Sequence, residues 1–171
     1  SPLRTLISLC FALTVTLSQR TEETVAIYFA KAQQPAIKEM LPQKAQSLEE
    51  ALSDYRETLL PSSTSYGRTV WADHRYVGDV WCYCIDLNEE PNAMLSYCIF
   101  EDVLWNQGIA TRAVALFLEE IRQRFTLRTI GAFTYSDNHA SIKVLEKNGF
   151  SAVEEFSEDG RKSGYYQLSF H

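Results

Sequence analysis

The chain has 171 residues, of which 46% are hydrophobic and 22% are charged. This length and composition predict one globular domain, residues 1–171, with enough apolar side chains for a sizeable core. The net charge of −6 argues against nucleic-acid binding, which needs a basic surface. No apolar segment reaches the roughly 20 residues of a membrane-spanning helix, so we expect no membrane association.

The four cysteines, Cys10, Cys82, Cys84 and Cys98, lack the paired spacing that binds zinc, and no metal site is predicted. Cys82 and Cys84 lie two apart in a strand-like run, which predicts that both point to one face of a sheet. We interpret all four as reduced thiols in or near that sheet, which indicates a cytoplasmic protein. A disulfide or a metal pair is the less favoured alternative.

The first apolar stretch covers residues 6–17 and follows Arg4, as in the apolar region of a secretory signal. Its second half alternates, however, with Leu13, Val15 and Leu17 on one face and two threonines on the other. The β-branched residues in this half favour extended backbone. We therefore expect a half-buried first strand.

Two helices are expected next. Thr21 can cap the first helix, which would reach about Gln34 and end at Pro35. Ser47 opens a capping-box sequence, Ser-Leu-Glu-Glu, which begins a second helix reaching about Leu60.

The rest of the chain alternates between strand and helix patterns. Residues 69–72, 77–87 and 93–100 predict an antiparallel meander. An amphipathic helix then starts near Ala110, followed by a strand over 129–135, a short helix from Asn138, and a hairpin of 150–156 and 165–170. The predicted fold class is α/β, with a mixed, mostly antiparallel sheet and helices on both faces.

The segment Trp105-Asn-Gln-Gly-Ile-Ala-Thr joins a strand to the strongest helix. The first amides of a helix have no intrahelical partner and lie at the positive end of its dipole. Gly108 would let an anion approach the backbone closely, and Ala110 and Thr111 keep the first turn small. These features predict a main-chain phosphate site. Neither a Walker sequence nor the dinucleotide fingerprint is present.

A single glycine before a helix is also typical of an ordinary turn, and Asn138 alone is typical of a helix cap. The combination is more specific. Trp105-Asn-Gln-Gly-Ile-Ala-Thr resembles the coenzyme loop of the GNAT acyltransferase superfamily, in its ribosomal-protein N-acetyltransferase-like subgroup, where W-G-K-G-x-A-T is common. The segment Asn138-His-Ala-Ser-Ile-Lys-Val-Leu-Glu-Lys-Asn-Gly-Phe150 resembles the second motif of that subgroup.

This resemblance implies the GNAT fold, acetyl-CoA as co-substrate and an N-acetyltransferase. The acceptor would be a primary amine on a small molecule or a peptide or protein N-terminus, and the resemblance is compatible with a homodimer. The main chain of one strand end would pair with the pantetheine arm and polarise the thioester carbonyl: Ile99, Phe100 and Glu101. The loop and helix start would hold the pyrophosphate: Gln107, Gly108, Ile109, Ala110 and Thr111. Asn138 would bind the pantetheine arm, and Ser141 would lie near the thioester sulfur.

The proton chemistry stays open in the sequence. Many superfamily members have a tyrosine as general acid where Leu145 stands, so the leaving thiolate must receive its proton from Ser141, Tyr135 or water. Glu101 and Asp102 are the candidate bases for the amine.

Two other functions are compatible with the sequence. A coenzyme-A-binding sensor without turnover is the main alternative, because the usual tyrosine is missing and Arg112 stands where the subgroup often has glutamate. A site for an ordinary nucleotide is the third hypothesis, and it predicts tighter binding of ATP than of coenzyme A.

Overall fold

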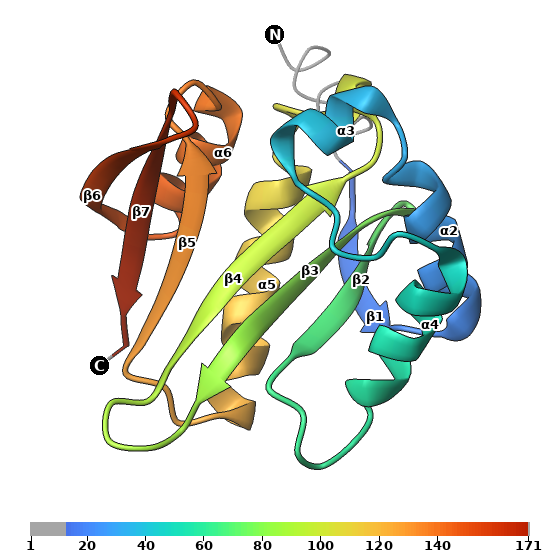
Figure 1. Ribbon diagram of the computed structural model, residues 1–171, viewed down its shortest axis with the longest axis horizontal. Helices are drawn as coiled ribbons and strands as arrows, with labels where there is room; N and C mark the ends of the chain where they lie inside the picture. The colour runs from blue at the N-terminus through green and yellow to red at the C-terminus, as the bar shows by residue number, and fades with distance from the viewer. Residues whose placement is uncertain (1–12, 171) are drawn as a thin grey trace, which may run out of the picture.

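Seven strands form one mixed sheet in the order β1-β2-β3-β4-β5-β7-β6 (Figure 1). The computed structural model describes residues 13–170. The strands are β1 (Val15–Gln19), β2 (Tyr66–Ala72), β3 (Arg75–Asp86), β4 (Asn92–Ile99), β5 (Thr129–Tyr135), β6 (Ser151–Glu158) and β7 (Arg161–Ser169). The helices are α2 (Glu22–Lys31), α3 (Pro35–Met40), α4 (Leu48–Glu57), the 3-10 turn η1 (Asp102–Leu104), α5 (Ile109–Arg124) and α6 (His139–Lys147).

The sheet is antiparallel except where β4 meets β5, the two strands that α5 connects. Helices α2, α3 and α4 lie on the front face in Figure 1, and α5 and α6 lie behind the sheet. The predicted fold class is therefore confirmed. Within residues 13–170, no helix is long and apolar enough to cross a membrane.

The predicted first strand is confirmed from Val15, which pairs with Ala72 of β2. Residues 6–12 of the apolar stretch, and Cys10 with them, lie outside the described residues.

Both predicted helix caps are present. The Thr21 hydroxyl accepts a hydrogen bond from the Thr24 amide at 3.1 Å, and the Ser47 hydroxyl accepts one from the Glu50 amide at 3.1 Å. The prediction for Pro35 was wrong, because α2 ends at Lys31 and Pro35 begins α3. A proline fits the first helical position, where the missing N–H would have no partner.

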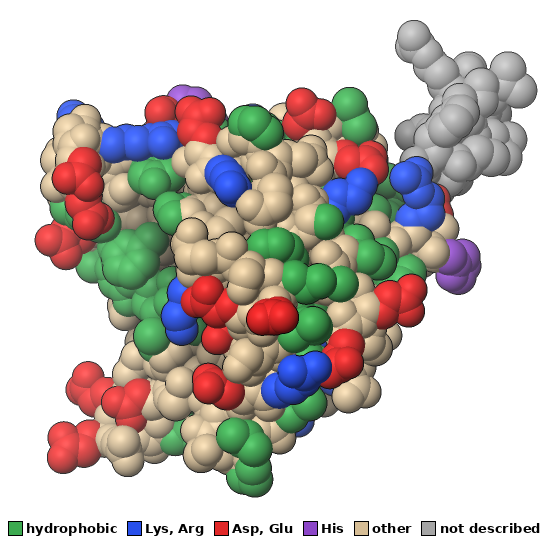
Figure 2. Space-filling view, turned by 45° about the vertical axis from the view of Figure 1, so that its right-hand side comes forward, with side chains coloured by type: hydrophobic (Ala, Val, Ile, Leu, Met, Phe, Trp, Pro, Cys, Tyr) green, Lys and Arg blue, Asp and Glu red, His purple; other side chains and the backbone are tan. Residues whose placement is uncertain are grey.

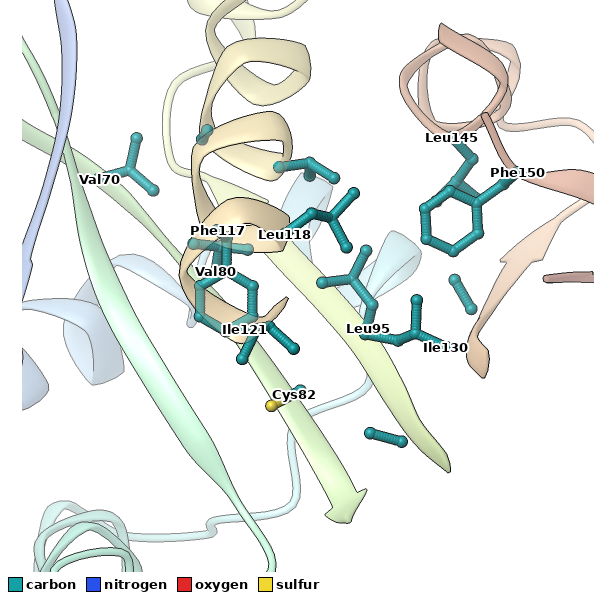
Figure 3. Close-up of a cluster of buried hydrophobic side chains, with 14 of the residues drawn as sticks. Val70, Val80, Cys82, Leu95, Phe117, Leu118, Ile121, Ile130, Leu145 and Phe150 are labelled. Carbon is teal, nitrogen blue, oxygen red and sulfur yellow. The ribbon is translucent and has the colours of Figure 1, made fainter. Parts of the chain in front are cut away.

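The larger core lies between the sheet and α5. Phe117, Leu118 and Ile121 project from one side of α5 toward the sheet (Figure 3), and each is at most 6% exposed. Leu145 of α6 and Phe150 extend this core under β5 and β7. Spacings of three and four place apolar residues on one face of α5, as the sequence predicts.

The two neighbouring cysteines do not share a face. Cys82 belongs to the core under α5, together with Ile85, whereas Cys84 is exposed. The predicted alternation was wrong here because Cys84 has a φ of 51° and the register shifts between Tyr83 and Asp86. Such a bulge re-aims the side chains that follow it. Among the described residues, Cys82, Cys84 and Cys98 are free thiols.

A second, smaller core lies under α2 and α3, and beside it Asp79 of β3 is only 3% exposed. Arg20 donates a hydrogen bond to this carboxylate at 3.0 Å, and the Tyr76 hydroxyl donates another. Burial raises the pKa of Asp79 from 3.8 to about 6, although Arg20 and Tyr76 act in the opposite direction. The folded protein therefore holds this proton more tightly than the unfolded chain does.

This raised pKa predicts how stability depends on pH. The contribution of Asp79 to stability is largest below its unfolded pKa and is lost as the pH rises through its folded pKa. Relative to an Asp79→Asn variant, the wild-type free energy of unfolding should fall by on the order of 3 kcal/mol between about pH 3.5 and pH 7. Urea denaturation of both proteins over this range measures their free energies of unfolding. A wild-type protein that becomes more stable relative to Asp79→Asn as the pH rises would contradict the prediction.

Candidate active site

The sheet splits between its two parallel strands. Only Asn92, Ala93 and Met94 of β4 pair with β5, and beyond them the strands diverge (Figure 1). A cavity of about 260 Å³ lies in this split. Residues of α3, of the α5 N-terminus and of α6 complete its walls.

The cavity reaches both faces of the sheet. Consecutive residues of β4 line it, and successive side chains of a strand point to opposite faces. Leu95 and Ile99 of β4 face the core under α5, whereas Cys98 faces the small core under α2 and α3. We call the two parts of the cavity the α5 side and the α3 side.

Gly108, the N-cap of α5, lines the α5 side of the cavity. Its φ of 81° is left-handed, and a Cβ atom added there would meet nothing within 4 Å. The first helical hydrogen bond joins the Arg112 amide to the Gly108 carbonyl at 3.0 Å, so the amides of Ile109, Ala110 and Thr111 have no acceptor within the helix. The backbone here is accessible and presents unpaired donors.

The five residues predicted to hold a phosphate do not all lie on the cavity wall. Gly108, Ala110 and Thr111 line it. The Ile109 side chain is only 1% exposed and anchors the first turn of α5 in the core. Gln107 is exposed, and its side chain donates to the Val103 carbonyl at 2.6 Å.

Trp105 fixes the loop before α5. Its indole N–H donates to the Ile99 carbonyl at 2.9 Å, and its ring packs against the core. This bond ties the loop to the last residue of β4, so the strand end and the helix start are held together at one end of the cavity.

The free edge of β4 is formed by alternate residues. The Phe100 amide donates to the Val77 carbonyl of β3 at 2.9 Å, so it is not free to pair with a ligand. Because hydrogen-bonding directions alternate in an antiparallel pair, the main-chain groups of Tyr97 and Ile99 point away from β3 toward the cavity. Of the predicted strand end, Ile99 therefore offers its amide to the cavity, and the Phe100 amide does not.

Ser141 lies on the first turn of α6 and lines the α5 side. The Asn138 side chain caps this helix by accepting from the Ser141 amide at 3.1 Å. The Ser141 hydroxyl lies 2.7 Å from the Tyr97 hydroxyl of β4. Burial raises the pKa of Tyr97 to about 12, so the tyrosine is neutral at physiological pH. No local pattern in the sequence pointed to Tyr97, which lies 44 residues from Ser141.

Three candidate acid–base residues do not belong to the lining of the cavity: Glu101, Asp102 and Tyr135. Glu101 lies 3.8 Å from Arg75 at the surface, and Asp102 is exposed in η1. The Arg161 guanidinium lies over the Tyr135 ring, 3.6 Å from its centroid.

Two lysines line the α5 side, and neither was among the predicted site residues. Lys143 and Lys147 lie one helical turn apart on α6, and they are the charged side chains among the described lining residues. Asn148 holds α6 beside α5 by donating to the Thr111 carbonyl at 3.2 Å. Their spacing of four, which places them on one helix face, was the signal in the sequence.

The family model described as acetyltransferase (GNAT) domain matches residues 14–151. The search among curated protein sequences gave no significant match.

Solved structures share the fold at low sequence identity. The aminoglycoside acetyltransferase AAC(6')-Ib in complex with coenzyme A has 16% identity and a TM-score of 0.76, covering 91% of this chain and 95% of that one. The ribosomal L7/L12 alpha-N-protein acetyltransferase RimL, with coenzyme A, has 18% identity and a TM-score of 0.76, covering 91% and 94%. RimJ of Mycobacterium smegmatis has 19% identity and a TM-score of 0.74, covering 91% and 81%.

The matched domain covers most of the chain and contains the whole split between β4 and β5. The chain belongs to the GNAT acetyltransferase family and is an acetyl-CoA-dependent N-acetyltransferase.

Proposed function

We propose that this protein transfers the acetyl group of acetyl-CoA to a primary amine of a small molecule or a peptide in the cavity between β4 and β5. One observation carries the proposal: the unpaired amides at the start of α5 and the free edge of β4 meet in the same cavity. Helix N-terminal amides suit a pyrophosphate, and a free strand edge suits the amide-bearing pantetheine arm.

The residues on the α5 side fit coenzyme A. Ala110 and Thr111 would donate main-chain hydrogen bonds to the pyrophosphate beside Gly108. Lys143 and Lys147 add positive charge next to them. Structures of the same fold hold coenzyme A, among them AAC(6')-Ib and RimL, which supports this choice of ligand over an ordinary nucleotide.

The chain's own groups account for the reaction. The amine nitrogen forms a bond to the carbonyl carbon while the carbon–sulfur bond breaks. The Ile99 amide would donate to the carbonyl oxygen as negative charge develops there. Ser141 would give a proton to the leaving sulfur while its oxygen accepts a hydrogen bond from the neutral Tyr97 hydroxyl, and water would return to Ser141 the proton that the amine releases. The amine loses its proton to water, because Glu101 and Asp102 lie off the cavity wall.

A thiol-release assay with acetyl-CoA and an amine panel tests the function. The panel combines small amines, an aminoglycoside and peptides with free N-termini. We expect stoichiometric coenzyme A release and acetylation of at least one amine. Binding of acetyl-CoA without product on any amine would favour the sensor, and tighter binding of ATP would favour a nucleotide site.

Removing the Ser141 hydroxyl should slow turnover more than it weakens coenzyme binding. A positioned proton donor contributes about 100-fold or more to a rate, so Ser141→Ala should lower kcat by roughly this factor and change the Kd of acetyl-CoA by less than about threefold. Steady-state kinetics and calorimetry measure the two quantities.

The matched control is Ser136→Ala, because Ser136 is a nearby serine that does not line this cavity and contacts Glu155 instead. The control should keep wild-type kcat. Tyr97→Phe should show an intermediate loss of kcat, since Ser141 keeps its own proton. An unchanged kcat in Ser141→Ala would remove Ser141 from the acid role.

A further inference from the structure

Among the described residues, the lining of the α3 side includes no charged side chain, although the Arg161–Asp137 ion pair lies beside it with Arg161 against Met40. Two strands, α3 and the residue that follows it provide its lining: Ile37, Met40, Leu41, Ser96, Cys98 and Phe133. Burial raises the pKa of the Cys98 thiol to about 12, so this group is neutral as well. Among the described residues that line the whole cavity there is no Asp or Glu.

Phe133 is the most prominent apolar group on this side. It lies on β5 and is 54% exposed, although it lines the cavity. Its ring contacts Tyr165 of β7 and Phe156 of β6, with centroid distances of 5.2 Å and 5.8 Å. We call these three residues the aromatic cluster.

The aromatic cluster lies on an uncovered part of the sheet. Within residues 13–170, no helix lies in front of β5, β7 and β6, whereas α6 lies behind them (Figure 1). Apolar side chains gather on this side of the molecule, at the left of Figure 2. An exposed apolar patch that continues into a cavity indicates a surface that contacts a ligand.

We infer that the acceptor is a primary amine attached to an aliphatic or aromatic group, which packs on Phe133 and α3. This inference rests on the proposed function. The coenzyme occupies the α5 side, so the amine must approach the thioester from the α3 side. An apolar wall without carboxylates disfavours the ammonium form, and the neutral amine is the form that attacks a thioester.

The same wall disfavours acceptors with several positive charges. A second ammonium group of the acceptor would lose its hydration there and find no carboxylate partner. Specificity would therefore follow the apolar group next to the amine.

Two isosteric amines test this selectivity. Hexylamine and 1,5-diaminopentane have the same length, and only the diamine carries a second charge. We expect at least a tenfold higher kcat/KM for hexylamine at the same pH. Phenethylamine and the dipeptide Phe-Ala both carry a phenyl group near a primary amine. A comparison of their kcat/KM values shows whether the preferred acceptor is a small amine or a peptide N-terminus.

A substitution ties the selectivity to the aromatic cluster. Phe133→Ala should lower kcat/KM for hexylamine and phenethylamine about ten- to hundredfold, the range that corresponds to burial of one apolar group. The Kd of acetyl-CoA should stay unchanged. Val153→Ala is the control, because Val153 is an exposed apolar residue of β6 that does not line this cavity, and it should match the wild type.

The outcomes separate the two proposals. A preference for the diamine, or equal losses for all amines in Phe133→Ala, would overturn the inference and leave the acetyltransferase activity standing. Binding of acetyl-CoA without turnover of any amine would overturn the proposed function and this inference with it.

Discussion

Replacing Gly108 with Asp should raise the Kd of acetyl-CoA at least about 100-fold. Gly108 is the N-cap of α5 and borders the unpaired amides at the helix start. The new carboxylate would lie where the pyrophosphate is expected, and two like charges 4 Å apart repel by about 4 kcal/mol at an effective dielectric constant of 20. Isothermal titration calorimetry at constant ionic strength measures the affinity.

Gly108→Asn separates charge from backbone strain. The φ of 81° at Gly108 is left-handed, and Asn and Asp tolerate that conformation better than other side chains do. Neither substitution meets a steric obstacle, because a Cβ atom here has no neighbour within 4 Å. The Asn variant should bind within about tenfold of the wild type, since αL strain costs only about 1–2 kcal/mol. Equal affinities of the two variants would show that the phosphates bind elsewhere.

Gly78→Ala should destabilise the fold by about 3 kcal/mol or more, which corresponds to a decrease in Tm of about 6–12 °C. Gly78 of β3 lies opposite Ile99 of β4. A Cβ atom at this position would lie 2.0 Å from the Cys98 carbonyl oxygen. That oxygen belongs to the backbone, so relief requires β3 and β4 to move apart. Circular dichroism during thermal unfolding measures the change.

Gly164→Ala is the matched control in the same sheet. Its added Cβ would lie 2.9 Å from the ring of Tyr166, a half-buried side chain that can shift without moving a strand. The control should lose clearly less stability than Gly78→Ala. Because the clash at Gly78 displaces the strand end that offers the Ile99 amide, any folded Gly78→Ala protein should also bind acetyl-CoA more weakly. A Tm equal to that of the control would contradict the predicted close approach of β3 and β4.

Several features followed from the sequence because they depend on local backbone chemistry. Thr21 and Ser47 cap their helices through hydroxyls that reach an amide three residues ahead. The amphipathic helix expected near Ala110 begins at Ile109, directly after Gly108. The spacing of apolar residues in α5 determined its buried face. Pro35 misled the prediction, since a proline ends one helix and begins another with equal ease.

The arrangement of side chains around the cavity depended on the tertiary structure. Tyr97 meets Ser141 only because β4 and α6, far apart in the chain, flank the same split. The candidate bases Glu101 and Asp102 are adjacent to the strand end in sequence, yet neither belongs to the lining of the cavity. Sequence proximity did not reveal this, because the direction of a side chain after a strand depends on how the following loop packs.

The sequence by itself determined the family, and it predicted the donor and the main-chain phosphate site at Gly108, because each rests on a contiguous segment. Only the tertiary structure decided the Tyr97–Ser141 contact and the uncharged α3 side with Phe133. Both arise where β4 and β5 part, after three residues of pairing. The physical reason is that the cavity lies between two strands that diverge. Its lining depends on how several distant segments pack, which the sequence of any one segment does not determine.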